Sequence, residues 1–175
     1  MANPIDIVVA KARGFEKSME AHRDGLLGVF QTLAKQHGEA VALIDRVRDD
    51  TKKRDPLWRT IEIALVSHER AELEAVYPVL AEEPQLRTYV ERHAREADAL
   101  TALIGRLNTM PMTGEDWMTV FDELGDAVAT HAAEEEHEIF PAALAVIGEN
   151  CAKQLDDRFK AAHKRARASF EKTRH

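Results

Sequence analysis

The sequence predicts an all-α fold, an antiparallel up-down four-helix bundle with an N-terminal extension and an extra C-terminal helix. Apolar residues recur at the 3.6-residue period of a helix along nearly the whole chain, while signals for β-strands are scarce. The breaks between the periodic segments are few and short, and short connections make neighbouring helices antiparallel. A chain of 175 residues is long enough for one such domain with a sizeable core.

The breaks in the pattern place the ends of the bundle helices. Asp55 is expected to cap the second helix, with Pro56 at its first position, and Pro84 can begin the third. Thr113 is expected to cap the fourth helix, which ends near Gly148. The four helices are therefore expected at residues 15–48, 57–81, 84–107 and 115–147.

Two flanking segments complete the expected organisation. Residues 1–14 form an N-terminal extension, in which Pro4 is expected near the start of a short helix, and residues 15–150 form the bundle. Residues 151–175 form an amphipathic C-terminal helix that is expected to pack across the bundle. Cys151 is the only cysteine, which excludes a disulfide framework, and we expect a half-buried thiol there.

The overall charge and hydropathy restrict the partners. The net charge of −7 disfavours nucleic acid and anionic membrane surfaces, because both require a basic face. No apolar run approaches the length of a membrane span, and no secretory signal is visible. We therefore expect a cytoplasmic protein with no nucleic acid or membrane as partner.

Two segments of the sequence repeat each other at an offset of 63 residues. In each, a histidine is followed by glutamate four residues later, an aromatic residue nine later and proline ten later. The aromatic-proline pair is not expected by chance after both histidines, so it indicates an internal duplication. The repeated residues are His68, Glu72, Tyr77 and Pro78 in the first segment, and His131, Glu135, Phe140 and Pro141 in the second.

The histidines and glutamates of this repeat interrupt the apolar faces of their helices. Residues four apart lie on the same face of a helix, so each His-Glu pair points into the core. A buried carboxylate needs a partner, and a metal cation serves two such carboxylates beside two imidazoles. The other two helices each place a histidine on the same kind of apolar face. The six candidate metal ligands are His37, His68, Glu72, His93, His131 and Glu135.

Histidine with bridging carboxylate suits iron, and two iron ions can share the two glutamates. Zinc is chemically allowed in the same place but fits bridging carboxylates less well. A single core histidine is usually a satisfied core residue, and only the four together favour ligation. The remaining histidines, which match no such pattern, are expected at the surface or periphery: His22, His137, His163 and His175.

At these residues the sequence resembles the hemerythrin-like, or HHE cation-binding, family over residues 33–147. The motif of that family is His, His-x-x-x-Glu, His and His-x-x-x-Glu, and the flanking residues around His37 and Phe140 also match. The resemblance implies a non-haem pair of iron ions with an oxo or hydroxo bridge. In the implied arrangement Glu72 and Glu135 bridge the ions, His37 and His68 bind one iron, and His93 and His131 bind the other.

The sequence departs from the oxygen-carrying hemerythrins on the third helix. Those proteins carry His-x-x-x-His there and end their motif with His-x-x-x-x-Asp, whereas Ala97 stands four residues after His93 in this chain. We therefore expect the iron bound by His93 to be more open, or to be filled by another donor. Tyr89 is a candidate ligand or a plain core tyrosine, and Glu69 is a candidate ligand or a solvated charge.

The leading functional hypothesis is a di-iron protein that binds or reacts with dioxygen, hydrogen peroxide or nitric oxide at an open iron position. A peroxide-decomposing, catalase-like oxidoreductase is one form of it. The alternatives are an iron-responsive sensor module and an iron store without turnover. A ferritin-like oxidase is disfavoured because its Glu-x-x-His pattern occurs only at Glu134 to His137.

Overall fold

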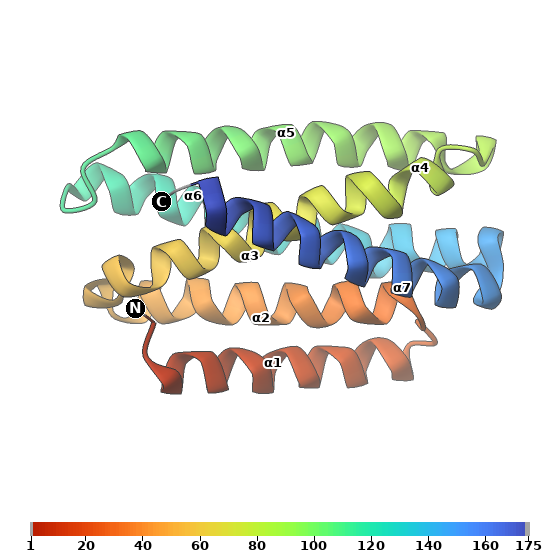
Figure 1. Cartoon of the computed structure of the whole chain (residues 1–175), viewed down its shortest axis with the longest axis horizontal. Helices are drawn as coiled ribbons and strands as arrows, with labels where there is room; N and C mark the ends of the chain where they lie inside the picture. The colour runs from red at the N-terminus through yellow and green to blue at the C-terminus, as the bar shows by residue number, and fades with distance from the viewer. Residues whose placement is uncertain (1, 174–175) are drawn as a thin grey trace.

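The computed structural model describes residues 2–173, and every regular element in that range is helical. None of the helices in this range has both the length and the apolar composition that a membrane span requires. Along the chain they are α1 (Pro4–Arg23), α2 (Val29–Asp49), η1 (Thr51–Lys53), α3 (Arg54–Ala75), α4 (Tyr77–Leu80), η2 (Pro84–Leu86), α5 (Arg87–Thr109), α6 (Glu115–Glu134), η3 (Glu135–Ile139) and α7 (Phe140–Thr173) (Figure 1).

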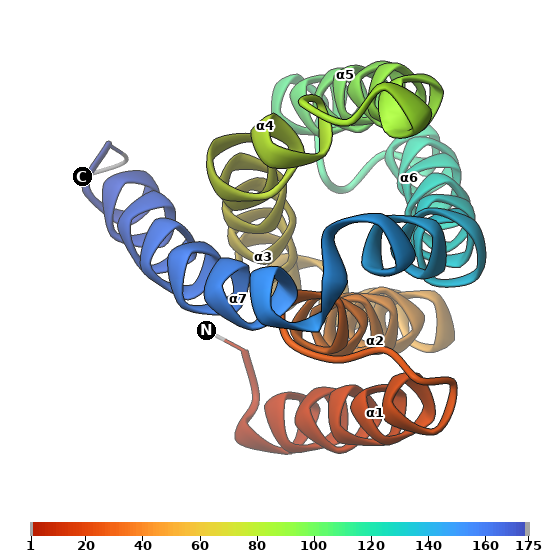
Figure 2. The same ribbon diagram turned by 90° about the vertical axis from the view of Figure 1, so that its right-hand side faces the viewer.

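Four helical segments form the predicted antiparallel bundle, which is thereby confirmed. They are α2, α3 with α4, α5, and α6 continued through η3 into the first part of α7. Figure 2 looks along the bundle and shows these segments around a common centre, with α1 outside them against α2. Helices that surround one centre can each direct one face into the same core.

The helix expected over residues 15–48 is interrupted, and this expectation was wrong. α1 ends at Arg23 and α2 begins at Val29. Gly25 and Gly28 between them have φ values of 86° and 60°, which glycine adopts far more readily than other residues. The chain therefore reverses direction, and α1, which begins at Pro4, lies alongside α2 as an additional helix (Figure 1).

A buried ion pair holds the start of α1 against the bundle. Asp6 is only 2% exposed, and its Oδ1 accepts hydrogen bonds from Arg46 Nε (2.8 Å) and Lys53 Nζ (2.6 Å). The hydrogen bond from Lys53 lowers the pKa of Asp6, although burial opposes it, so the carboxylate stays charged. At the very start of the helix, the Asn3 side chain accepts from the Ile5 backbone N–H.

Two of the expected helix caps were wrong. Asp50, rather than Asp55, provides the cap before the second bundle helix, because it accepts a hydrogen bond from the Lys52 backbone N–H (3.1 Å) and starts η1. Asp55 therefore lies within the first turn of α3. Gly114 precedes α6 in place of a capping Thr113.

The C-terminal segment turns sharply away from the bundle helix that precedes it. Gly148 has φ 78° and ψ 165°, which breaks α7 into two parts. The second part packs across α3, as expected for the extra helix, and buries Leu155, Phe159 and Ala162 (Figure 1). Cys151 is half-buried, as expected.

The apolar core consists of two clusters, one toward each end of the bundle. The first includes Leu43, Leu57, Leu107 and Phe121, and the second includes residues from the start of α2, the end of α3 and the first part of α7. Along their helices, His37, His68 and His131 lie between residues of the first cluster and residues of the second. The histidines and glutamates thus form a polar layer across the middle of the core.

Replacing Gly28 with alanine is expected to destabilise the protein by about 2 kcal/mol or more, because its backbone conformation is strained for other residues. A Cβ atom there would also lie 2.5 Å from the backbone of Ala152 in α7. Gly105 on α5 is the control, since a Cβ atom meets nothing within 4 Å there. Gly105→Ala should gain about 0.5–1 kcal/mol from the lost flexibility of glycine. Urea unfolding of both variants tests this, and a Gly28→Ala protein as stable as the wild type would contradict it.

Candidate metal centre

The six predicted ligands converge in one buried layer. His37 comes from α2, His68 and Glu72 from α3, His93 from α5, His131 from α6 and Glu135 from η3. All six are buried, and Glu72, His93 and Glu135 are 0% exposed. Together with Glu69 they form two groups in which the potential ligand atoms all lie within 4.8 Å of one another. These are Glu69, Glu72, His93 and His131, and His37, His68 and Glu135.

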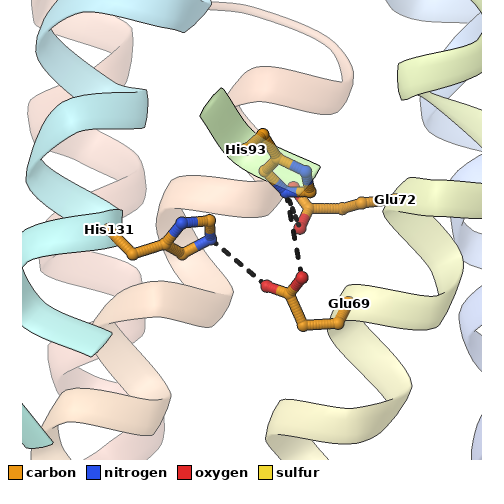
Figure 3. Close-up of side chains that lie close together, drawn as sticks. All are labelled: Glu69, Glu72, His93 and His131. Carbon is orange, nitrogen blue, oxygen red and sulfur yellow. Dashed lines mark ion pairs between the residues drawn. The ribbon is translucent and has the colours of Figure 1, made fainter. Parts of the chain in front are cut away.

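Glu69 belongs to the first group, and the alternative of a solvated charge is wrong. It is 8% exposed, and its Oε1 lies 3.2 Å from His131 Nε2. Its other oxygen, Oε2, lies 3.8 Å from His93 Nε2 (Figure 3). Glu69 thus lies beside His131 and beside His93, whose helix lacks the further histidine of the oxygen carriers.

Glu72 and Glu135 each contact histidines of both groups. Glu72 Oε2 lies 3.2 Å from His68 Nε2 and 3.5 Å from His93 Nε2. Glu135 Oε2 lies 3.2 Å from His37 Nε2 and 3.5 Å from His131 Nε2. These two carboxylates therefore stand between the groups, which is the position of a bridging ligand.

Neighbouring side chains orient three of the four imidazoles. A hydrogen bond from Nδ1 to a carboxylate or amide oxygen fixes the tautomer, so the lone pair of Nε2 faces the cluster. The sequence did not single out these three acceptors. The pairs are His37 with Glu136 (2.9 Å), His68 with Gln36 (3.0 Å) and His131 with Glu96 (3.0 Å).

The fourth imidazole, His93, is held by a tyrosine ring. Tyr77 stacks on His93 with ring centroids 3.5 Å apart and an interplanar angle of 18°. Its hydroxyl donates a hydrogen bond to Glu135 Oε1 (2.5 Å). Burial, and then the charge of Glu135, raise the pKa of Tyr77 well above its usual value, so the phenol keeps its proton.

Tyr77 was noted in the sequence only as part of the repeat, and its counterpart Phe140 occupies the equivalent place. Phe140 stacks on His37 with ring centroids 6.0 Å apart. Tyr89, the tyrosine considered from the sequence, is half-buried beneath the Arg92 guanidinium. Within residues 2–173, Tyr89 has no hydrogen bond to the cluster.

The prolines of the repeat explain why both helices change next to the site. Proline removes a backbone donor and clashes with the carbonyl four residues earlier. In the first repeat, before Pro78, α3 ends and α4 begins anew. In the second, before Pro141, the α-helix widens into the π-helical turn η3, which begins with Glu135. Such turns are frequent at functional sites, and the prolines are the signal that could have located them.

The electrostatics of the cluster favour protonated histidines in the metal-free protein. Burial alone lowers the pKa of His37, but the carboxylates of Glu135 and Glu136 outweigh it and raise the pKa to about 9. The pKa of His131 likewise rises to about 12, against the effect of burial, beside Glu135 and Glu69. Burial raises the pKa of Glu72, yet His68 and His93 lower it well below its usual range.

Nine nitrogen and oxygen atoms of the seven clustered side chains are buried without a hydrogen-bond partner among the described residues. Unpartnered buried polar atoms are costly, especially on carboxylates. Two donors at a right angle around an ion with bonds of about 2.1 Å lie about 3.0 Å apart. The observed separations of 3.2–3.8 Å are close to that spacing, so the donor set fits metal ions.

His163, which was expected at the periphery, lies next to this layer instead. It is half-buried on the second part of α7, and its Nε2 is 3.0 Å from the Ser67 hydroxyl. Burial, with the positive charges of His68 and Arg167, lowers its pKa to about 4. His22 and His137 are exposed, as expected, and His175 lies outside the described residues.

Comparison with known proteins identifies the family. Residues 8–143 match the model of the hemerythrin HHE cation-binding domain. No curated protein and no solved structure matches the chain. The matched range covers most of the chain and all seven clustered residues, and it indicates a domain that binds metal cations. The chain therefore belongs to the hemerythrin HHE cation-binding domain family.

Proposed function

We propose that the chain is a non-haem di-iron protein that binds or reacts with a small oxygen species at its metal pair. The observation that carries the proposal is the set of nine unpartnered donor atoms buried on seven facing side chains. The three carboxylates carry a total charge of −3, and two ferrous ions carry +4. Two metal ions would therefore compensate the buried negative charge. Carboxylate with imidazole is the ligand set of non-haem iron.

In this proposal Glu72 and Glu135 would be shared between two ions, together with an oxo or hydroxo group. His93, His131 and Glu69 would hold one ion, while His37 and His68 would hold the other. The distances support this division, since Glu69 approaches only the first pair of histidines. Glu69 would then be the further donor at the ion held by His93. The open position would be at the other ion, held by His37 and His68.

The proposed ligands are dioxygen, hydrogen peroxide and nitric oxide, and the proposed enzymatic form is peroxide decomposition. The metal pair supplies two-electron redox chemistry, so that two molecules of hydrogen peroxide yield two of water and one of oxygen without another reductant. The chain's own residues orient the imidazoles through Glu136, Gln36 and Glu96. Tyr77 Oη keeps its proton in a hydrogen bond to Glu135 and so orients that carboxylate within the buried layer.

Metal content and the visible spectrum of the isolated protein test the proposal directly. We expect two iron ions per chain, charge-transfer absorption that changes with azide, and oxygen release from hydrogen peroxide. The proposed function would be excluded if the protein holds two iron ions, its spectrum does not change with oxygen or nitric oxide, and it does not consume hydrogen peroxide.

An iron-responsive module is the second candidate, and one contact favours it. Ser67 directly precedes His68 in the sequence, and its hydroxyl forms a hydrogen bond with His163 on the second part of α7. Metal loading at His68 and the docking of that helix are thereby linked. Limited proteolysis compares the two forms. Faster cleavage within residues 149–173 of the metal-free protein supports the module, and equal cleavage excludes it.

Removal of a bridging carboxylate should release both ions. Glu135→Gln removes one negative charge between the two groups, so the iron content is expected to fall from two ions per chain to nearly none. Glu123→Gln is the matched control on the preceding helix α6, because Glu123 is exposed and its one ion pair within residues 2–173 is with Arg106. Iron is measured by atomic emission after desalting. Retention of one tightly bound ion in Glu135→Gln would contradict the bridging assignment.

Metal binding is expected to release protons and to strengthen as the pH rises. His37 is protonated below its pKa of about 9, and only the neutral imidazole binds a metal. In the metal-free protein this raised pKa stabilises the fold fully below about 6.5, and the contribution is lost as the pH rises through about 9. The gain in stability on adding anaerobic iron(II) should therefore grow from about pH 6 to about pH 8. Urea unfolding with and without metal at both pH values measures this gain, and a constant gain would contradict the prediction.

A further inference from the structure

A cavity of about 300 Å³ leads from the surface to the metal-binding layer. Its outer wall comes from two helices that lie outside the four-helix bundle. These are the first half of α1, with Ile7, Ala10 and Lys11, and the second part of α7, with His163 and Arg167. The start of α1 and the end of α7 lie toward the same end of the bundle (Figure 1).

The inner end of the cavity is formed by the proposed ligands themselves. His37, His68, Glu69 and His131 line it, and they come from both groups of the cluster. His37 and His68 are the two histidines that bind the more open ion in the proposed function. A molecule in the cavity would therefore have one end at the metals.

The size of the cavity exceeds what a diatomic ligand requires. One water molecule occupies about 30 Å³ in the liquid, so about 300 Å³ corresponds to roughly ten non-hydrogen atoms. A volume of that order is at the lower end of the range for sites that bind small organic molecules.

Most of the cavity surface is apolar, and Ala10, Ala40, Leu43, Leu65, Leu100 and Val128 contribute to it, while Gln36, Glu39 and Thr60 add polar groups. Lys11 and Arg167 are exposed and so mark the opening. A mostly apolar surface suits a ligand with an apolar body, and the polar groups at the inner end suit a polar head on the same ligand.

We propose that the cavity binds an alkyl or aryl hydroperoxide, with its apolar body between α1, α2 and α3 and its peroxide group at the metals. This inference rests on the proposed function and names the substrate class of the same site. Reduction of such a molecule follows ROOH + 2 e⁻ + 2 H⁺ → ROH + H₂O. The two electrons would come from a reduced, diferrous metal pair held by the clustered residues, and the protons would come from solvent.

The probe is 2-phenyl-2-propanol, the unreactive alcohol that corresponds to cumene hydroperoxide and that has ten non-hydrogen atoms. Binding is measured by calorimetry and by protein NMR shifts in both the metal-free and the iron-loaded protein, so the readout does not depend on turnover. Two variants fill the cavity, Ala10→Phe on α1 and Ala64→Phe on α3, because both alanines line it. Ala102→Phe is the matched control, since Ala102 is exposed on α5 and away from the cavity.

The alcohol should bind the wild type and Ala102→Phe alike, and binding should weaken at least about tenfold in Ala10→Phe and Ala64→Phe. Equal binding by all four proteins, or no binding by the wild type, overturns the proposal. If Ala10→Phe fails to fold, because Ala10 is buried in the core, Ala64→Phe still decides, because Ala64 is only half-buried.

Peroxide assays separate this inference from the proposed function. The filled variants should lose consumption of cumene hydroperoxide by the reduced protein while they still consume hydrogen peroxide. Hydrogen peroxide consumption by a wild type that binds no alcohol overturns only the cavity proposal. In the opposite case, the wild type binds the alcohol and the filled variants do not, but the iron-loaded protein consumes neither peroxide. That result supports the cavity proposal and overturns the proposed function.

Discussion

The fold depends on the burial of three carboxylates and four imidazoles in one layer of the core. Those seven side chains leave nine polar atoms without hydrogen-bond partners, which a core cannot tolerate without a compensating charge. Two apolar clusters on either side of the layer hold the helices at the distance that the layer requires. The apolar clusters supply the packing of the fold, and the layer between them supplies its chemistry.

Much of this arrangement was predictable from the sequence, because it follows from the helical period. His68 and Glu72, four residues apart, had to share a face, and that face was the apolar one. The convergence of His37 and His93 on the same layer followed from four short-linked helices. Glu69 was ambiguous for the same reason, since it follows His68 directly and points about 100° away around the helix. Its burial depends on where α5 and α6 lie.

The features that the sequence did not predict are those set by tertiary packing or by single backbone torsions. The helical period continues across Gly25 and Gly28, so their positive φ values, and the separate helix α1, were hidden within one long pattern. His163 looked peripheral because its helix lies outside the motif. It approaches the site only because the break at Gly148 directs the second part of α7 across α3.

The stacked aromatic rings connect the two halves of the duplication crosswise. Tyr77 of the first half covers His93 of the second, and Phe140 of the second half covers His37 of the first. Each half therefore supplies the aromatic ring that stacks on a histidine of the other half. Both contacts are stacked but their chemistry differs, because Tyr77 carries a hydroxyl group and Phe140 does not. His93 and His37, which occupy matching places in the two halves, thereby have chemically different neighbours.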